Sequence, residues 1–182
     1  MIVVVGTLSA RLEGQQVRSD SFSVTVAVAL AAAGEAVELV SKVGADDAGE
    51  ALIAQLAASR IGHVALIRDA ARATTQDGGA ALDMDAADLQ LALRYLTQFD
   101  AVLLVDPEDD VVVATVLDAC NYAGARLVVT RPVGSARAEV PVGEYRQGPP
   151  PLEVERPAGD PAATVALLVA LLVSDREPSA AD

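Results

Sequence analysis

Short apolar stretches alternate with longer apolar or amphipathic stretches along the chain, and Gly, Asp and Pro residues separate them. Stretches of about four to eight residues rich in Val, Leu and Ile are typical of buried strands, whereas the longer Ala-rich stretches are typical of helices. This pattern predicts an α/β protein with a mostly parallel sheet between two layers of helices, a three-layer αβα sandwich. The predicted strands are residues 2–5, 37–43, 64–67, 80–82, 101–105, 126–130 and 152–155, and the predicted helices are residues 22–33, 46–58, 86–97, 107–122 and 161–173.

Residues that favour helix ends flank several of these helices. Gly34 follows the first helix, at the position where a left-handed residue commonly ends one. Asp46 and Asp47 begin the second helix, where the helix dipole favours negative charge, and either side chain could cap it. Pro107 and the acids after it are expected to open the fourth helix, and Gly124 to close it.

The remaining segments are polar or rich in Pro and Gly. Residues 7–20 and 131–151 are predicted to be loops.

The last helix, residues 161–173, has apolar side chains all around, which predicts that it is deeply buried. We expect one domain over residues 1–175, followed by a polar tail over residues 176–182.

A set of glycines and charged residues lies at characteristic spacing in the first third of the chain: Gly34, Lys42-Val43-Gly44, Asp46-Asp47, Gly49-Glu50 and Ile61-Gly62. Their order resembles the N-terminal signature of the ribokinase-like (PfkB) carbohydrate kinases. The resemblance implies a truncated, degenerate ribokinase-like fold. Most of the small lid that covers the sugar in that family is expected to be missing, because residues 7–20 are too few to hold it.

A second motif, Pro157-Ala158-Gly159-Asp160, precedes the last helix. It resembles the family's "GAGD". The resemblance implies that Asp160 is the base that takes the substrate hydroxyl proton, and that Ala158 and Gly159 form an anion hole for the phosphoryl group. The alternative is structural, because Asp followed by Pro commonly begins a helix. Pro157 and Pro161 lack N–H donors where developing charge needs them, so we favour the helix cap.

The sugar and nucleotide signatures of the family are not matched. Asp20-Ser21 stand where the family has a glycine pair, which lets backbone approach a ligand closely, and Thr25 stands where it has an Asn. The "NxxE" motif, which organises magnesium and phosphate in the family, is missing, because Asn121 is the only Asn and no Glu follows it at that spacing. The segment that supplies this motif is expected to be deleted between residues 131 and 152.

Other candidate site residues have structural alternatives. Lys42 lies at a strand end beside Gly44, so both are candidates for substrate binding, although a solvated or ion-paired Lys is the simpler interpretation. The acids of residues 106–110 could bind a cation, but we favour a helix cap and first-turn acids that answer the helix dipole. One His and the single Cys120 cannot build a zinc site, so no metal site is predicted, and Cys120 is expected to be a core residue.

Charge narrows the class of partner. The net charge is −13 and no run of basic residues occurs, so the chain offers no row of groups to neutralise nucleic-acid phosphates or an anionic membrane. The longest apolar run, residues 161–173, is too short to cross a bilayer as a regular helix. A cytoplasmic location is expected, since a lone cysteine fits a reducing compartment.

Three functions remain open. The first is a degenerate member of the carbohydrate-kinase family without efficient phosphotransfer, which binds a small molecule or a protein partner, or forms a homodimer through surface that the missing lid leaves bare. The second is an active ATP-dependent kinase of a sugar or nucleoside hydroxyl with Asp160 as base. The third is a structural or assembly role. ATP and Mg²⁺ are expected as cofactors only if the chain is active.

Overall fold

The structure is a computed structural model that describes residues 1–13, 16–19, 21–71, 73–74, 84–96, 98–134, 140, 149–156 and 161–174. The strands in this part of the chain are β1 (Ile2–Val5), β2 (Ala10–Glu13), β3 (Gln16–Ser19), β4 (Val37–Gly44), β5 (Ile61–Gly62), β6 (Leu66–Asp69), β7 (Ala101–Val105), β8 (Arg126–Arg131) and β9 (Leu152–Glu155). The helices are α1 (Phe22–Ala32), α2 (Asp47–Ala58), α3 (Ala86–Arg94), α4 (Asp110–Ala123) and α5 (Pro161–Ser174).

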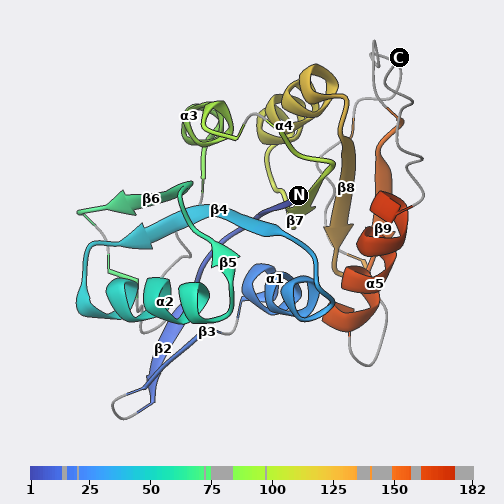
Figure 1. The fold of residues 1–182 in the computed structure, drawn as a ribbon. Helices are drawn as coiled ribbons and strands as arrows, with labels where there is room; N and C mark the ends of the chain where they lie inside the picture. The colour runs from blue at the N-terminus through green and yellow to red at the C-terminus, as the bar shows by residue number, and fades with distance from the viewer. Residues whose placement is uncertain are drawn as a thin grey trace.

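Seven of the strands form one sheet in the order β5-β4-β1-β7-β8-β9, with β6 also beside β4. Every pair in this sheet is parallel. Helices α1, α2 and α5 cover one face of the sheet, and α3 and α4 cover the other (Figure 1). The predicted three-layer α/β sandwich is therefore confirmed.

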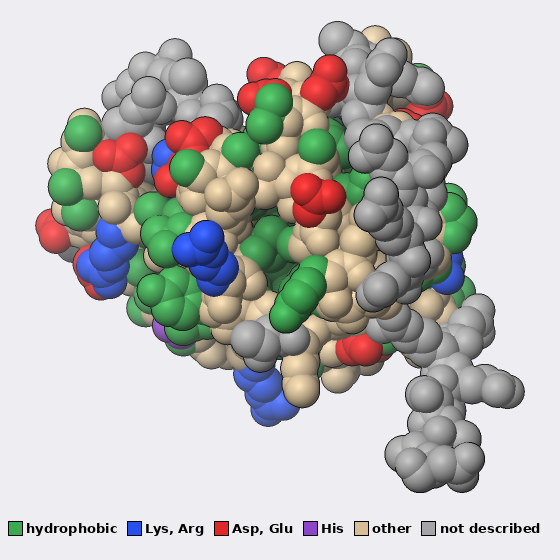
Figure 2. All heavy atoms as spheres, turned by 90° about the horizontal axis from the view of Figure 1, so that it is seen from above, with side chains coloured by type: hydrophobic (Ala, Val, Ile, Leu, Met, Phe, Trp, Pro, Cys, Tyr) green, Lys and Arg blue, Asp and Glu red, His purple; other side chains and the backbone are tan. Residues whose placement is uncertain are grey.

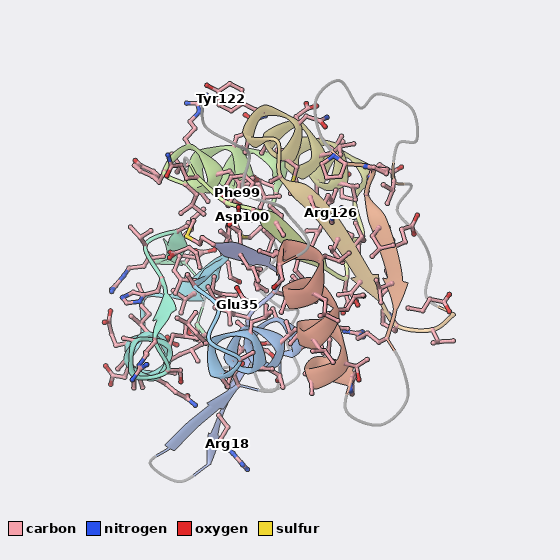
Figure 3. All side chains as sticks on the ribbon, turned by 45° about the vertical axis from the view of Figure 1, so that its right-hand side comes forward. Arg18, Glu35, Phe99, Asp100, Tyr122 and Arg126 are labelled. Atoms are coloured by element: carbon pink, nitrogen blue, oxygen red, sulfur yellow. The ribbon has the colours of Figure 1, made fainter. Side chains whose placement is uncertain are left out.

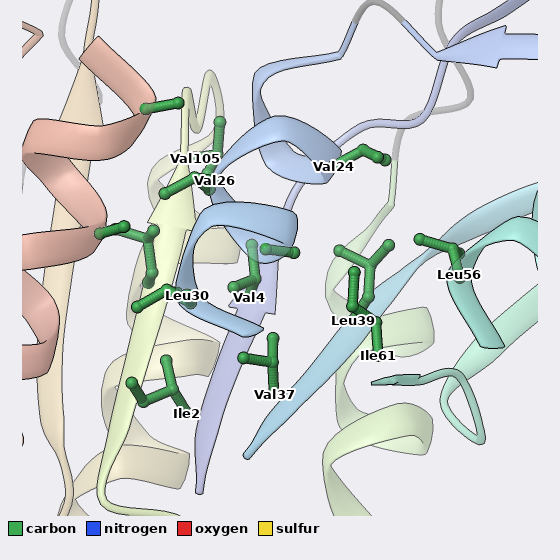
Figure 4. Packing of buried hydrophobic residues seen from close by; sticks show 14 of the residues in the cluster. Ile2, Val4, Val24, Val26, Leu30, Val37, Leu39, Leu56, Ile61 and Val105 are labelled. Carbon is green, nitrogen blue, oxygen red and sulfur yellow. The ribbon is translucent and has the colours of Figure 1, made fainter. Parts of the chain in front are cut away.

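The central strand β1 divides the two hydrophobic cores. Its side chains alternate in direction, so Ile2 and Val4 lie in the core under α1, α2 and α5 (Figure 4), while Val3 and Val5 lie in the core under α3 and α4. All four are buried, and burying one such side chain stabilises the fold by roughly 1.5–3 kcal/mol. Burial on both faces explains why the strand is apolar at every position.

Two of the predicted helix ends, at Gly34 and Gly124, are confirmed. Gly34, just after α1, has φ of 94°, and Gly124, the C-cap of α4, has φ of 63°. These are left-handed conformations that glycine adopts without steric cost. The predicted start of α4 was too early, because the helix begins at Asp110 with Asp109 as its N-cap, and Pro107 lies in the segment between β7 and the helix.

The loop predicted for residues 7–20 was wrong in part. Strands β2 and β3 pair antiparallel in this segment and form a hairpin that projects from the body of the molecule (Figure 1). Each strand has only four residues and a single large apolar side chain, Leu12 or Val17, so its alternation is too short to distinguish a strand from a polar loop. The resemblance places lid strands in this region, and here a two-stranded hairpin occupies it.

The prediction that residues 161–173 are deeply buried was also wrong. Helix α5 buries one face, which packs beside α1, whereas Leu167 and Leu171 are 61% and 54% exposed. An apolar helix on the outer layer of a sandwich has a neighbour on one side only. Composition alone cannot distinguish that position from one in the centre of the fold.

The strand predicted at residues 64–67 is replaced by two short strands, β5 and β6, which pair with different parts of β4. The buried carboxylate of Glu38 lies between them and accepts hydrogen bonds from Val64 N–H at 2.6 Å and Ala65 N–H at 3.3 Å. The Glu38 side chain thus accepts the hydrogen bonds of two backbone N–H groups that have no strand partner where the pairing with β4 is interrupted. The strand predicted at residues 80–82 lies outside the described residues.

The start of α2 is tied to a distant segment by Asp46. Its carboxylate accepts hydrogen bonds from Gly49 N–H at 2.9 Å and from Thr74, both N–H at 2.8 Å and Oγ1 at 2.7 Å. Thr74 Oγ1 in turn accepts a hydrogen bond from Gly44 N–H at 2.8 Å. A Cβ at Gly49 would clash with the Gly44 carbonyl oxygen, so glycine is required there. The residues that carry the family resemblance therefore have a structural role.

Replacing Asp46 with Ala is expected to lower the free energy of unfolding by about 1–3 kcal/mol, because Gly49 and Thr74 both lose their acceptor. Urea denaturation at pH 7, followed by circular dichroism, measures this change. Asp47→Ala is the matched control, since Asp47 is an exposed first-turn residue. Equal stability of the two variants would show that the hydrogen bonds to Asp46 do not stabilise the start of α2.

The same carboxylate gives a pH dependence. Burial is the largest single influence and raises the pKa of Asp46, but the hydrogen bonds from Thr74 and Gly49 together outweigh it, and the pKa lies below its ordinary value of 3.8. The stability that Asp46 contributes is therefore complete above about pH 4 and is lost as the pH falls further. The stability difference between the native protein and Asp46→Asn should shrink over that range.

Candidate functional site

A crevice opens at the carboxyl ends of β1 and β7. From β1 the chain passes through α1 to β4 on one side, whereas β7 lies on the other side of β1, so the strand order reverses between them. Open parallel sheets hold their ligands at such a switch point. The crevice has a volume of about 520 Å³, and its described polar lining comes from Thr7, Asp85, Asp106, Glu108 and Asp109.

Close backbone packing brings β1, β7 and α1 together at this edge. A Cβ at Gly6 would lie 2.8 Å from the Cβ of Ser23 and 3.0 Å from that of Val105. The absence of a side chain therefore lets the start of α1 approach the strand ends. Ser23 also donates a hydrogen bond from Oγ to the Thr7 carbonyl oxygen at 2.6 Å, which fixes α1 against the segment that follows β1.

Asp106 is the most unusual residue of the crevice. It directly follows β7 and has φ of 48°, a left-handed conformation that non-glycine residues rarely adopt. Its N–H donates to the Thr130 carbonyl oxygen at 2.9 Å, and its Oδ2 accepts from Arg156 Nη1 at 2.7 Å. Its Oδ1 is buried and has no hydrogen-bond partner among the described residues. Strain and an unsatisfied buried oxygen in one residue are typical of functional sites.

Burial raises the pKa of Asp106, because the charged form loses hydration. The neighbouring Arg156 and, more weakly, Arg131 act in the opposite direction, and Glu108 adds to the rise. The net shift is upward, so ionisation of this carboxyl costs the folded state free energy. A buried carboxyl with a shifted pKa beside a crevice is a candidate functional group.

Arg156 joins three elements at the edge of the crevice. Its guanidinium binds Asp106 and stacks over the ring of Phe22, with 4.5 Å from Cζ to the ring centroid. Its backbone N–H donates to the Arg131 carbonyl oxygen at 2.8 Å. The end of β7, the start of α1 and the end of β9 are thereby held in fixed relation. Nearby, the fully buried Thr130 has an Oγ1 without a hydrogen-bond partner in the described structure.

Comparison with solved structures identifies the arrangement. A putative ribokinase from Escherichia coli aligns with a TM-score of 0.59 at 12% identity, over 71% of this chain and 52% of its own. A PfkB protein from a Polaromonas species aligns with a TM-score of 0.55 at 19% identity, over 71% and 54%. An uncharacterized sugar kinase from Pyrococcus horikoshii aligns with a TM-score of 0.54 at 18% identity, over 75% and 56%.

The chain has the ribokinase-like fold. At these identities the similarity shows the fold alone, and the chain spans just over half the length of the solved structures that it matches. No family model matches the sequence. No curated protein sequence matches it either. Among the helices that the structure describes, none combines the length and the apolarity needed to cross a membrane.

The predicted anion hole and base, Ala158, Gly159 and Asp160, lie outside the described residues. Both neighbours of this segment are described, and α5 begins at Pro161 as predicted. Arg156, which contacts Asp106, directly precedes the segment. The roles assigned to these three residues stay predictions. Their neighbour Arg156 binds Asp106, which lines the crevice, but Arg156 is not itself among the described lining residues.

Lys42 and Gly44, the other predicted substrate-binding residues, lie at the carboxyl end of β4. Lys42 forms an ion pair with Asp88 of α3, which is one of the two forms that the structural alternative left open. Its charge also helps to lower the pKa of Asp85, after the larger effect of the hydrogen bond from Asp88 N–H. Gly44 contacts Thr74 rather than the crevice. Neither residue is among the described residues that line the crevice, and their role in substrate binding stays a prediction.

Two of the acids at residues 106–110 have the roles in α4 that the structural alternative predicted, a helix cap and a first-turn acid. Asp109 caps the helix and accepts a hydrogen bond from Val111 N–H at 2.8 Å, and Asp110 lies in the first turn. No group of three metal-ligating side chains gathers within the described part of the chain. Cys120 is buried in α4, and burial raises the pKa of its thiol to about 12, so it is a core residue as predicted.

Sequence reasoning missed Phe22, Arg156 and the special conformation of Asp106. An available signal was the position of Asp106, the first polar residue after the five-residue apolar strand β7. In a parallel sheet that position lies at the ligand-binding edge. No local pattern marks Arg156, because its partners are far away in the sequence.

Asp106→Asn is expected to be at least as stable as the native protein at pH 7.5. Asn adopts left-handed backbone readily, keeps an acceptor for Arg156 and removes the buried charge. Because the pKa of Asp106 is raised, the stabilising effect of its protonated form is complete below about pH 4 and is lost as the pH rises through the folded pKa. The advantage of the Asn variant should therefore grow as the pH rises from about 4 through the folded pKa of Asp106.

Urea midpoints across this pH range measure the effect. Asp106→Ala is the contrast variant, because Ala disfavours the backbone conformation and leaves Arg156 without its acceptor, so it should lose stability at every pH. An Asn variant that is less stable than the native protein at pH 7.5 would show that the ionised carboxylate is structural.

Proposed function

We propose that this protein binds a small, uncharged, hydroxylated molecule of the sugar class in the crevice and does not transfer phosphate efficiently. The observation that carries the proposal is the charge of the crevice. Four of its described lining residues carry carboxylates, namely Asp85, Asp106, Glu108 and Asp109, and none of the described lining residues is Lys or Arg. Asp106 is ion-paired with Arg156, so the negative charge of the crevice rests mainly on the other three. Carboxylates accept hydrogen bonds from sugar hydroxyls and repel phosphate.

The size of this repulsion supports the proposal. Two like charges about 5 Å apart at a protein surface repel by about 3 kcal/mol at an effective dielectric constant of 20. A nucleotide brings several phosphate charges, and phosphoryl transfer depends on cations placed around them. The charge of the crevice therefore favours the sugar and disfavours the nucleotide.

The start of α1 supports the loss of the family's substrate signature. Thr25, which stands at the position of the family's Asn, donates its hydroxyl hydrogen bond to the Ser21 carbonyl oxygen of its own helix at 3.1 Å. The Ser21 hydroxyl hydrogen-bonds with Ser19 at 2.7 Å. Both polar groups thus have partners within the protein. Pro157 and Pro161 add to this argument, because neither can donate an N–H to a developing charge.

A second candidate function is an active ATP-dependent kinase with Asp160 as base. One observation favours it: Arg156 and the start of α5 lie at the same edge of the sheet as the crevice, which is where the resemblance places the catalytic motif. Binding of a protein partner and association with a second copy of the chain stay predictions.

The two functions are separated by thermal shift measurements with a panel of pentoses, hexoses and nucleosides, each with and without MgATP. We expect at least one neutral hydroxylated compound to raise the melting temperature and MgATP alone to leave it unchanged. Asp106→Asn should reduce the shift, since its carboxylate lines the crevice. Asp110→Asn is the matched control, because Asp110 is not among the described lining residues.

Transfer of radiolabelled phosphate from the γ position of ATP to the same panel tests the kinase directly. We expect no transfer above background. Transfer that disappears in Asp160→Asn would establish the active kinase instead, and the variant is informative because Asn caps a helix about as well as Asp. A panel in which no compound shifts the melting temperature would remove the ligand-binding proposal.

A further inference from the structure

A second cavity lies between α3 and α4, apart from the crevice and on the outer surface of that layer. Its volume is about 530 Å³, within the range of small-molecule sites. Figure 2 faces this side of the molecule and shows a hollow with hydrophobic side chains at its floor. No residue of the described lining is shared with the crevice, so the two sites are separate.

The floor of this cavity, which we call the α3–α4 groove, is part of the hydrophobic core. Leu93 and Leu96 come from α3 and the turn after it, and Phe99 precedes β7. All three are more than 90% buried and pack in the core under α3 and α4. On the rim Tyr122 is 93% exposed, at the outer edge of α4 (Figure 3). A rigid apolar floor with an aromatic rim suits a flat apolar group.

Two opposite charges stand on the two sides of this floor. Arg94 is the last residue of α3, and Asp118 lies on α4. Neither side chain forms an ion pair or a hydrogen bond with any described residue. They face one cavity without neutralising each other, so each is available to a ligand.

We propose that the α3–α4 groove binds a zwitterionic small molecule with an apolar body, of the class of an amino acid with an aromatic side chain. Its carboxylate pairs with the Arg94 guanidinium, its ammonium group pairs with the Asp118 carboxylate, and its side chain covers Leu93, Leu96 and Phe99. A purely apolar ligand would leave both charges unused, and a singly charged one would leave one of them unused. The site is independent of the function proposed for the crevice.

The absence of tryptophan from the protein allows a direct test. Four indole compounds are titrated by fluorescence up to about 10 mM, a range that covers weak metabolite sites. L-Tryptophan carries both charges, indole-3-propionate only the negative one, tryptamine only the positive one, and indole neither. We expect L-tryptophan to bind more tightly than the other three, with indole the weakest.

Two variants assign the charges. Arg94→Gln should weaken L-tryptophan and indole-3-propionate by about 2- to 5-fold and leave tryptamine unchanged, as expected for an exposed charge pair. Asp118→Asn should weaken L-tryptophan and tryptamine by a similar factor and leave indole-3-propionate unchanged. Arg60→Gln and Glu35→Gln are the matched controls, because they follow helices α2 and α1 on the opposite face of the sheet.

The melting temperature of each variant is measured first, so that a loss of binding is interpreted only in a folded protein. Failure of L-tryptophan to bind at about 10 mM overturns the proposal. Binding that neither groove variant changes also overturns it, because contact with the apolar floor alone would then explain it. Equal weakening by the control variants would show a general effect of net charge and would overturn it as well.

Discussion

Burial of β1 on both faces is the constraint on which the rest of the structure depends. A parallel strand covered by helices on both sides must be apolar at every position, and its neighbours must be reached by crossovers through those helices. The chain connects β1 to β4 through α1, which covers one face of the sheet. Helices α3 and α4, which precede and follow β7 in the chain, cover the other face. The reversal leaves the carboxyl ends of β1 and β7 without a connection above them, and the crevice is the consequence.

The chemistry at that edge opposes stability. Asp106 combines a left-handed backbone, a buried oxygen without a described partner and a pKa raised by burial. Arg156 and Phe22 compensate in part by holding the carboxylate in place. Proteins keep such costs mainly where a ligand or a reaction needs them. In the function proposed here, the acids around Asp106 select the ligand, because their charge favours hydroxyl groups over phosphate.

Local sequence was sufficient for most of the framework. The strands at residues 2–5, 101–105 and 152–155 and the glycine ends of α1 and α4 follow from short patterns, because burial and left-handed backbone restrict the choice of residue locally. The hairpin of β2 and β3 and the exposed side of α5 could not be predicted in this way. Both depend on what lies beside the element, which its own composition does not record.

The candidate site divides along the same line. Asp109 as a cap and the ion pair of Lys42 were anticipated, since each needs only a helix end or an opposite charge nearby. The link between Asp106 and Arg156 joins residues 50 positions apart and becomes visible only when β7 and β9 are placed in the sheet.

A calorimetric titration with one sugar and its monophosphate tests the central claim most directly, because the two ligands differ only in the charged group. The sugar used is the one that binds most tightly in the thermal shift panel. The titration is made at low ionic strength, where charges are screened least. The account predicts that the phosphate weakens binding by about tenfold or more. Equal or tighter binding of the phosphorylated sugar would show that the crevice is built to hold phosphate and would contradict the account.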